Sequence, residues 1–262
     1  MTIRDNAERV SGYITNWLKD YLSTTPLKGF VVGVSGGVDS ALTSTLCAKT
    51  GAKVILLNMP IRQTSQEYER SKAQINHLES QFENVTGIEI DLTQTFNHFE
   101  TDMPPMTSSD DLAMANSRAR LRMTTLYAVG QSNNLLVAGT GNKVEDFGVG
   151  FFTKYGDGGV DVSPIADLMK SEVYELARHL DVIPEILQAK PTDGLWGDDR
   201  NDEDQIGASY DELEWAMTFE GNETDISARE KEVLSIFRKL HEANKHKVRP
   251  IPVCEIPNEL KR

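Results

Sequence analysis

One stretch near the start of the chain decides the fold class: Val31-Val32-Gly33-Val34-Ser35-Gly36-Gly37-Val38-Asp39-Ser40. Its apolar beginning predicts a buried strand, its glycines predict a turn, and the spacing of Ala41, Leu42 and Leu46 predicts a helix. Such a strand–turn–helix unit directs backbone N–H groups and a helix N-terminus at one place, which suits a phosphate group. The stretch therefore predicts an anion-binding turn at the carboxyl end of a strand.

Asp39 places a second requirement on this turn. A carboxylate beside a polyphosphate is repelled unless a divalent cation lies between them, so Asp39 is a candidate magnesium ligand. The hydroxyl groups of Ser35 and Ser40 can donate hydrogen bonds to the same anion. The turn lacks the lysine of G-x-x-x-x-G-K-[ST], and its glycines do not fit G-x-G-x-x-G.

The turn also fits G-x-S-x-G, the nucleophile elbow of serine hydrolases. In that alternative Ser35 is the nucleophile, with His246 and an upstream aspartate as partners. An elbow serine usually follows several strands, whereas here roughly thirty residues precede it and most of them predict a helix. A glycine-rich turn without ligand and a regulatory nucleotide-binding module without turnover are further alternatives.

Strands and helices are predicted to alternate along the chain. The predicted helices cover 3–22, 39–49, 65–82, 110–131, 168–180 and 227–243, and the predicted strands cover 29–34, 53–59, 88–91 and 135–139. Residues 101–105 predict an exposed turn and 191–208 an acidic loop. This alternation predicts an α/β fold with a doubly wound, open parallel sheet, in a single domain over 1–262.

Composition limits the possible partners. With 262 residues, 39% of them hydrophobic and 26% charged, the chain is typical of a globular protein. The net charge of −13 disfavours a nucleic-acid partner and requires local basic residues around any anionic substrate. No apolar run is long enough for a membrane span or a signal core. Cys47 and Cys254 stand apart, which indicates packing residues and a cytoplasmic location.

Two later segments contain residue types suited to the same site. Gly139–Glu145 follows a predicted strand, so a hydroxyl at Thr140 and a carboxylate at Glu145 could complete a nucleotide and magnesium site with Asp39. The segment 150–161 contains aromatic side chains, Lys154 and two carboxylates. It predicts either a hairpin around Asp157-Gly158 or a site for an aromatic, anionic ligand.

Charged residues elsewhere have simpler interpretations. On the helix 110–131, Arg118 and Arg122 share a face while Arg120 points elsewhere, and at least one of them is a candidate phosphate contact. The acidic run 198–204 does not fit a calcium loop, because it has no glycine at the sixth position. It is therefore predicted to be a solvated loop.

Taken together, these segments resemble the ammonia-dependent NAD synthetases. The resemblance covers residues from about 29 to 250. It includes, in this order along the chain, the segments 33–40, 116–123, 139–145, 150–161, 190–192 and 246–247. The Ser-Gly-Gly-x-Asp-Ser turn is shared by the wider superfamily of N-type ATP pyrophosphatases, whereas Gly-Phe-Phe-Thr-Lys-Tyr-Gly-Asp-Gly-Gly at 150–159 is similar to this family specifically. Val248-Arg249 departs from the family, in which arginine directly follows the lysine.

The resemblance implies a set of site residues. ATP would be bound by Gly33, Val34, Ser35, Gly36, Gly37, Val38, Asp39, Ser40, Thr140, Lys170 and Thr192. Magnesium would be held by Asp39 and Glu145. Deamido-NAD would be bound by Arg120, Lys154, Asp161, His246 and Lys247. Asp157 would lie near the incoming ammonia. The family implies a homodimer with the dinucleotide site at the subunit interface.

The expected reaction is the ATP-dependent amidation of deamido-NAD by ammonia, through an acyl-adenylate, with release of AMP and pyrophosphate. Lys170 would offset negative charge, and Asp157 or Asp161 is a candidate acceptor for the ammonium proton. We expect no glutaminase domain in this sequence, so ammonia would come from solution or from a partner. The alternative within the superfamily is another amidase or a tRNA thiolase. Thiolation needs reactive cysteines and a basic surface, and this sequence offers neither.

Overall fold

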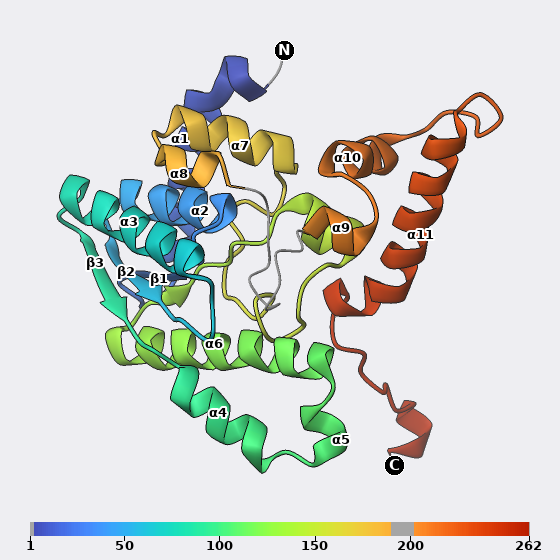
Figure 1. Ribbon diagram of the computed structural model, residues 1–262. Helices are drawn as coiled ribbons and strands as arrows, with labels where there is room; N and C mark the ends of the chain where they lie inside the picture. Colours follow the sequence, from blue (N-terminus) through green and yellow to red (C-terminus); the bar gives the residue numbers. More distant parts are fainter. Residues whose placement is uncertain (1–2, 190–201, 262) are drawn as a thin grey trace.

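The computed structural model describes residues 3–189 and 202–261. Four parallel strands form one open sheet in the order β3-β2-β1-β4, with bounds β1 (Gly29–Gly33), β2 (Lys53–Asn58), β3 (Val85–Glu89) and β4 (Leu136–Val137). Helices cover both faces of this sheet (Figure 1). The predicted α/β class with a doubly wound, open parallel sheet is confirmed.

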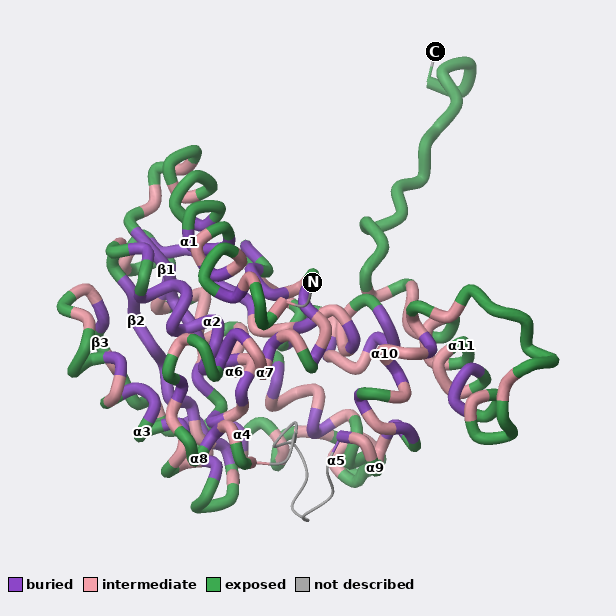
Figure 2. The backbone as a smooth tube through the Cα atoms, turned by 90° about the horizontal axis from the view of Figure 1, so that it is seen from above, coloured by how far each residue is buried: buried purple, intermediate pink, exposed green. Residues whose placement is uncertain are grey.

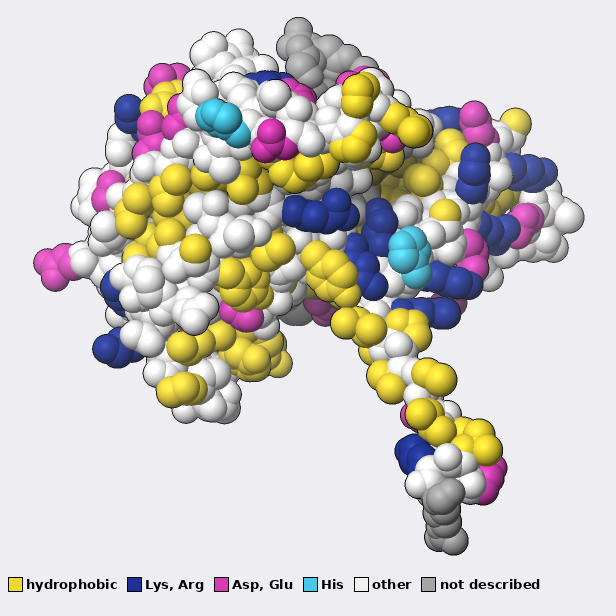
Figure 3. All heavy atoms as spheres, turned by 90° about the horizontal axis from the view of Figure 1, so that it is seen from below, with side chains coloured by type: hydrophobic (Ala, Val, Ile, Leu, Met, Phe, Trp, Pro, Cys, Tyr) yellow, Lys and Arg dark blue, Asp and Glu magenta, His cyan; other side chains and the backbone are white. Residues whose placement is uncertain are grey.

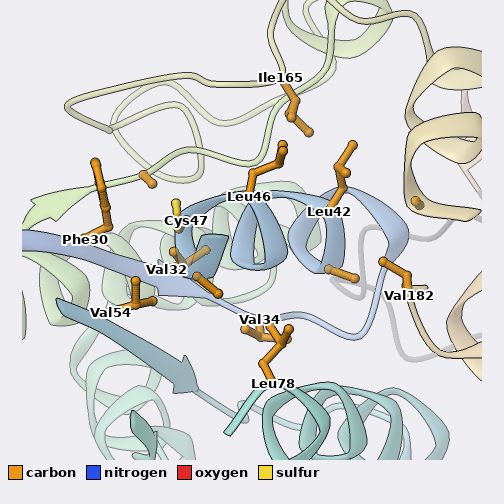
Figure 4. Close-up of a cluster of buried hydrophobic side chains, with 14 of the residues drawn as sticks. Phe30, Val32, Val34, Leu42, Leu46, Cys47, Val54, Leu78, Ile165 and Val182 are labelled. Carbon is orange, nitrogen blue, oxygen red and sulfur yellow. The ribbon is translucent and has the colours of Figure 1, made fainter. Parts of the chain in front are cut away.

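Alternate residues of β1 divide the interior into two layers. Phe30 and Val32 face one core, while Val31 faces the other, because successive side chains of a strand point to opposite faces. The first core contains Leu42, Leu46 and other buried side chains (Figure 4). It is covered by α1 (Ala7–Ser23), which follows the short η1 (Ile3–Asn6), and by α2 (Val38–Lys49), α3 (Ser65–Gln81), α7 (Lys170–His179) and α8 (Pro184–Leu187).

The opposite face of the sheet packs on two helices. They are α4 (Thr93–Asp102) and α6 (Asp111–Asn133), and α5 (Pro105–Ser108) connects them. Phe96 of α4 and Met114 of α6 are buried in this second core with Val31 and Leu57. The helix predicted over 110–131 is confirmed, and it ends at Asn134, whose φ of 56° forms a left-handed cap.

Several boundaries differ from the sequence prediction. The third strand begins at Val85 rather than at 88, and the helix α4 that follows it was not predicted. Of the predicted loop 191–208, residues 191–201 lie outside the described residues, but 202–206 form α9 (Asp202–Ile206). The next helix, α10 (Tyr210–Thr218), was also missed. It begins at a capping box formed by Ser209 and Glu212.

The predicted hairpin at 150–161 is wrong. This segment forms successive turns, in which the N–H groups of Gly156 and Gly159 donate to the carbonyl oxygens of Thr153 and Gly156. Instead of folding back on itself, the chain continues beside β4, where Val162 forms a parallel bridge with Ala138. Pairing with the main sheet therefore replaces the local antiparallel pairing.

A third core lies beside the sheet. It joins α10 and α11 (Ala228–Val248) to η2 (Lys143–Val149), a π-helical turn. Beyond α11, residues 249–261 form an arm that includes η3 (Asn258–Leu260), and every residue of the arm is exposed (Figure 2). Figure 3 shows hydrophobic side chains along this arm, which leaves the body of the molecule. Within 3–189 and 202–261, no helix is long and apolar enough to cross a bilayer.

Candidate active site

A cavity of about 240 Å³ opens at the carboxyl ends of β1 and β4. The sheet order places β2 on one side of β1 and β4 on the other, so this is the point at which the strand order reverses. Open parallel sheets bind their ligands at this position. All eight residues of the loop 33–40 line the cavity, together with Thr140, Glu145, Asp157 and Lys170. The fold therefore brings together most of the residues predicted for the ATP and magnesium sites.

The turn after β1 has the geometry of an anion-binding site. Gly36 has φ 85°, and a Cβ atom there would lie 2.6 Å from the carbonyl oxygen of Glu67, so only glycine fits. Gly37 is the N-cap of α2 and supplies no side-chain cap. The first residues of α2 line the cavity and have no capping side chain, so an anion could accept hydrogen bonds from their N–H groups.

Ser35 and Ser40 hold this turn together rather than forming a hydrolase site. The hydroxyl of Ser40 accepts from the backbone N–H of Ser35 at 3.1 Å and donates to the carbonyl oxygen of Gly37 at 3.0 Å. The Ser35 hydroxyl lies 3.1 Å from that of Ser40. None of the described residues that line the cavity is a histidine, so Ser35 has no general base there. The nucleophile-elbow alternative therefore finds no support in the site.

Two carboxylates and one ammonium group form the charged centre of the cavity. Nζ of Lys170 donates to Oδ2 of Asp39 at 2.7 Å and to Oε1 of Glu145 at 2.8 Å. The Lys170 side chain is 4% exposed and each carboxylate side chain is 17% exposed. Burial acts to lower the pKa of Lys170, but the attraction of both carboxylates outweighs it, so the net effect raises the pKa above its usual value.

Asn142 positions both carboxylates, although the sequence analysis did not single it out. Its Oδ1 atom accepts from the N–H groups of Val144 at 3.0 Å and Glu145 at 3.1 Å, which caps η2. Its Nδ2 atom donates to Oδ1 of Asp39 at 2.9 Å. An Asn followed three residues later by Glu is a helix-start signal that could have identified it.

A second group of acidic residues faces the same cavity. Burial, together with the smaller repulsion from the carboxylates of Glu145, Asp157 and Asp39, raises the pKa of Asp146 to about 8. Burial also raises the pKa of Asp157, against the hydrogen bond that its Oδ1 atom accepts from the N–H of Thr153 at 3.0 Å.

Basic residues on two helices supply the local positive charge that the net charge of the chain requires. Arg122 on α6 lines the cavity, donates from Nε to the carbonyl oxygen of Met59 at 3.0 Å, and has a pKa lowered to about 10 by burial and by Arg118. Arg70 on α3, not identified from the sequence, also lines it and donates from Nε to the Gly36 carbonyl oxygen at 3.1 Å. Arg70 thus holds a guanidinium group beside the turn after β1, where phosphate would bind.

The residues predicted to contact deamido-NAD are not among those that line the cavity. Nε of Arg120 donates to the carbonyl oxygen of Lys154, whose Nζ atom donates to the carbonyl oxygen of His246 at 2.9 Å. Nζ of Lys247 donates to the carbonyl oxygens of Gly150 and Phe152. Asp161 accepts from the N–H of Val137 and from the Tyr127 hydroxyl. Thr192, predicted for the ATP site, lies outside the described residues.

The donor set fits magnesium coordination shared with a nucleotide. Asp39 and Glu145 converge on one atom, the Nζ of Lys170, so their oxygens already face a common cation position. Among the described residues no cluster of three His, Cys, Asp or Glu side chains could hold a metal ion by itself. Mg²⁺ is usually bound by one or two carboxylates together with substrate phosphates and water, which this pair beside the anion-binding turn allows.

A comparison with known proteins assigns the family. The model of the NAD synthase family matches residues 10–251. The chain belongs to the NAD synthase family. The family resemblance inferred from the sequence is therefore confirmed. An NH(3)-dependent NAD(+) synthetase of Carboxydothermus hydrogenoformans is 35% identical over 259 residues, which cover 97% of this chain and 99% of that relative. One of Mesoplasma florum is 35% identical over 237 residues, 90% of this chain and 91% of the relative.

Solved structures share this fold. An NMN synthetase from Francisella tularensis has a TM-score of 0.84 and is 32% identical, covering 96% of this chain and 98% of that chain. An NH3-dependent NAD synthetase from Campylobacter jejuni has a TM-score of 0.75 over 95% of this chain and 99% of that chain, and at 24% identity it shows the common fold.

Proposed function

We propose that this protein is a ligase that amidates deamido-NAD with ammonia and ATP to form NAD, AMP and pyrophosphate. The observation that carries the proposal is the convergence of Asp39, Glu145 and Lys170 beside the uncapped N-terminus of α2, in a member of the NAD synthase family. Such a site can bind a polyphosphate and offset its charge.

The chemistry explains why ATP is required. A carboxylate is a poor acyl donor, because its leaving group would be oxide. The nicotinate carboxylate oxygen therefore attacks the α-phosphorus of ATP, and the bond from that phosphorus to the bridging oxygen breaks as pyrophosphate leaves. Ammonia then attacks the acyl carbon, the bond to the phosphate oxygen breaks, and AMP leaves. Lys170 and the N–H groups of α2 would stabilise the charge that develops on the phosphates.

Asp39 and Glu145 are the proposed ligands of Mg²⁺. When bound there, the metal ion would neutralise charge on the phosphate oxygens. The chain's own contribution is to hold both carboxylates in place, through Asn142 on Asp39 and through the Tyr210 hydroxyl, which donates to Oε1 of Glu145 at 2.6 Å.

Ammonium must lose a proton before it can attack. Asp157 is the favoured acceptor, since it lines the cavity, whereas both oxygens of Asp161 already accept hydrogen bonds from Val137 and Tyr127. Burial raises the pKa of Asp157, which makes its carboxylate a stronger base and so a better acceptor of the ammonium proton.

A homodimer would explain the position of the predicted dinucleotide-binding residues. Arg120, Lys154, His246 and Lys247 lie where α6, the 150–154 segment and α11 meet, outside the cavity. A second copy of the chain beside this surface would enclose a long substrate that reaches from it into the cavity. Light scattering with size-exclusion chromatography tests this, and a monomer at all concentrations would refute the shared site.

We propose free ammonia as the nitrogen donor and the cytoplasm as the location. The relatives of similar length are named as NH(3)-dependent enzymes, and their aligned regions cover nearly all of this chain. We also propose that residues 1–262 form a single domain.

The decisive experiment is incubation with magnesium-ATP, ammonium and deamido-NAD. NAD and AMP should form in equal amounts, and ADP as a product would refute the adenylation step. Asp39→Asn should lower turnover at least about 100-fold through loss of charge stabilisation. The matched control is Asp167→Asn at an exposed surface ion pair, which should leave turnover unchanged.

A second candidate is amidation of the mononucleotide to give NMN. It is favoured by the likeness to the Francisella tularensis NMN synthetase, which has a TM-score of 0.84. The same incubation with nicotinic acid mononucleotide separates the two, because a higher kcat/KM for the mononucleotide than for deamido-NAD would assign this second function.

A further inference from the structure

The ammonium group of Lys170 lies where the two proposed metal ligands converge. Its distances to Asp39 and Glu145, 2.7 Å and 2.8 Å, leave no room for a cation between them. Lys170 is the first residue of α7, at the positive end of a helix, where a basic side chain is unfavourable unless anions compensate it. The two carboxylates provide this compensation, and the centre of the Tyr210 ring lies 4.7 Å from Nζ.

A divalent cation and this ammonium group exclude each other. A magnesium ion bound to Asp39 and Glu145 would lie about 2.0–2.1 Å from their oxygens. It would fall close to the present position of Nζ, where like charges in a buried site repel strongly. The metal could therefore bind these oxygens only if the Lys170 side chain withdrew.

The charge of the Asp39–Glu145–Lys170 cluster explains why a nucleotide would favour binding of the metal ion. Two carboxylates and one ammonium group sum to −1, and an added divalent cation would change the sum to +1. A triphosphate beside α2 would supply the missing negative charge and accept a hydrogen bond from the displaced lysine, since Lys170 and the loop 33–40 line the same cavity.

We propose that Lys170 is the resident counter-cation of the Asp39–Glu145 pair, which weakens binding of a divalent metal in the free protein and moves aside when a nucleotide phosphate receives the lysine. This inference rests on the proposed function for the position of the metal and adds a coupling between metal and nucleotide. In the free protein, Lys170 thus acts as a competitor of the metal ion.

Binding of Mn²⁺ without nucleotide, measured by the electron paramagnetic resonance signal of the free ion, tests the proposal. Lys170→Met removes the charge at similar volume and should bind Mn²⁺ at least tenfold more tightly than the wild type. Lys170→Arg keeps a cation and should resemble the wild type. Lys143→Met is the matched control, because Lys143 pairs with Asp167 at the surface. Unchanged or weaker Mn²⁺ binding by Lys170→Met would overturn the proposal.

Two additional measurements keep the test decisive. In the double variant of Lys170→Met with Asp39→Asn, the gain in affinity should disappear, and a persistent gain would place the ion elsewhere and overturn the proposal. If Lys170→Met unfolds without metal, Mn²⁺ should restore its circular dichroism and melting transition, and failure to do so also counts against it. These readouts use no substrate, so a protein that makes no NAD can still pass them, and an active synthetase can fail them.

Discussion

Replacing Asn142 by Ala should affect stability and turnover together. The side chain is 0% exposed, and it makes the three hydrogen bonds that join η2 to Asp39. Loss of a helix N-cap costs about 1 kcal/mol. Loss of a buried hydrogen bond to a charged group costs about 2 kcal/mol. We therefore expect a loss of about 3 kcal/mol, which in a chain of this size lowers Tm by about 6–12 °C.

Turnover should fall about tenfold or more, because Asp39 and Glu145 both lose a positioning contact. Urea denaturation followed by circular dichroism measures the first effect, and NAD formation from deamido-NAD measures the second. Ser227→Ala is the matched control, since Ser227 caps α11 away from the cavity. It should cost about 1 kcal/mol and leave turnover unchanged.

A third variant separates the two roles of Asn142. Asn142→Asp keeps the acceptors that cap η2 but replaces the amide donor with a carboxylate against Asp39. It should therefore lose turnover to a similar extent. If Asn142→Ala were as stable and as active as Ser227→Ala, the reasoning that links the cap to the acidic pair would be refuted.

Three further predictions concern other parts of the molecule. The hydrogen bonds from Arg229 lower the pKa of Glu212 to about 2 from the ordinary value of 4.5, so its stabilisation is present above pH 4.5 and is lost as the pH falls toward 2. After allowance for solvent screening, Glu212→Gln should lower the free energy of unfolding by about 1 kcal/mol at pH 7 and should leave it unchanged near pH 2. Urea denaturation at both pH values measures this, and the same loss at both would contradict the prediction. Arg70→Met should weaken inhibition by pyrophosphate about tenfold with an unchanged melting temperature, because its guanidinium group lies beside the turn after β1. An unaltered inhibition constant would remove Arg70 from the phosphate site. Gly150→Ala should lower Tm by several degrees, because Gly150 has φ 66° and the new Cβ would lie 2.3 Å from the Cβ of Asn244. An unchanged Tm would show that α11 can shift to accommodate the added methyl group.

The features predicted correctly are those encoded by neighbouring residues. The strand–turn–helix unit around Asp39 has a local apolar pattern and glycines at fixed spacing, and the structure has it where the sequence predicts it. The alternation of apolar strand segments with helical segments likewise predicts the parallel sheet. In this chain the local pattern was sufficient for the fold class and for the position of the cavity.

The errors arise where long-range contacts outweigh local pattern. Asp157-Gly158 is a good hairpin signal, but the following Val162 pairs with Ala138 and the hairpin does not form. The role of Asn142 depends on Asp39, which is 103 positions away in sequence, so its hydrogen bond could not be read from spacing. The ion pair of Lys170 with Asp39 spans 131 positions and was equally hidden. The roles assigned to the predicted ATP, magnesium and deamido-NAD residues remain predictions, and among them Arg120, Lys154, Asp161, His246 and Lys247 do not line the cavity.

The exposed arm after α11 carries a cysteine whose thiol is accessible to reagents. The sequence contains two cysteines, of which Cys47 is enclosed in the core and has a thiol pKa raised by burial, while Cys254 lies on the arm, open to water. Alkylating reagents should therefore modify one thiol and spare the other, without any engineering of the chain. The emission of a fluorophore attached to Cys254 would change if the arm bound to another surface.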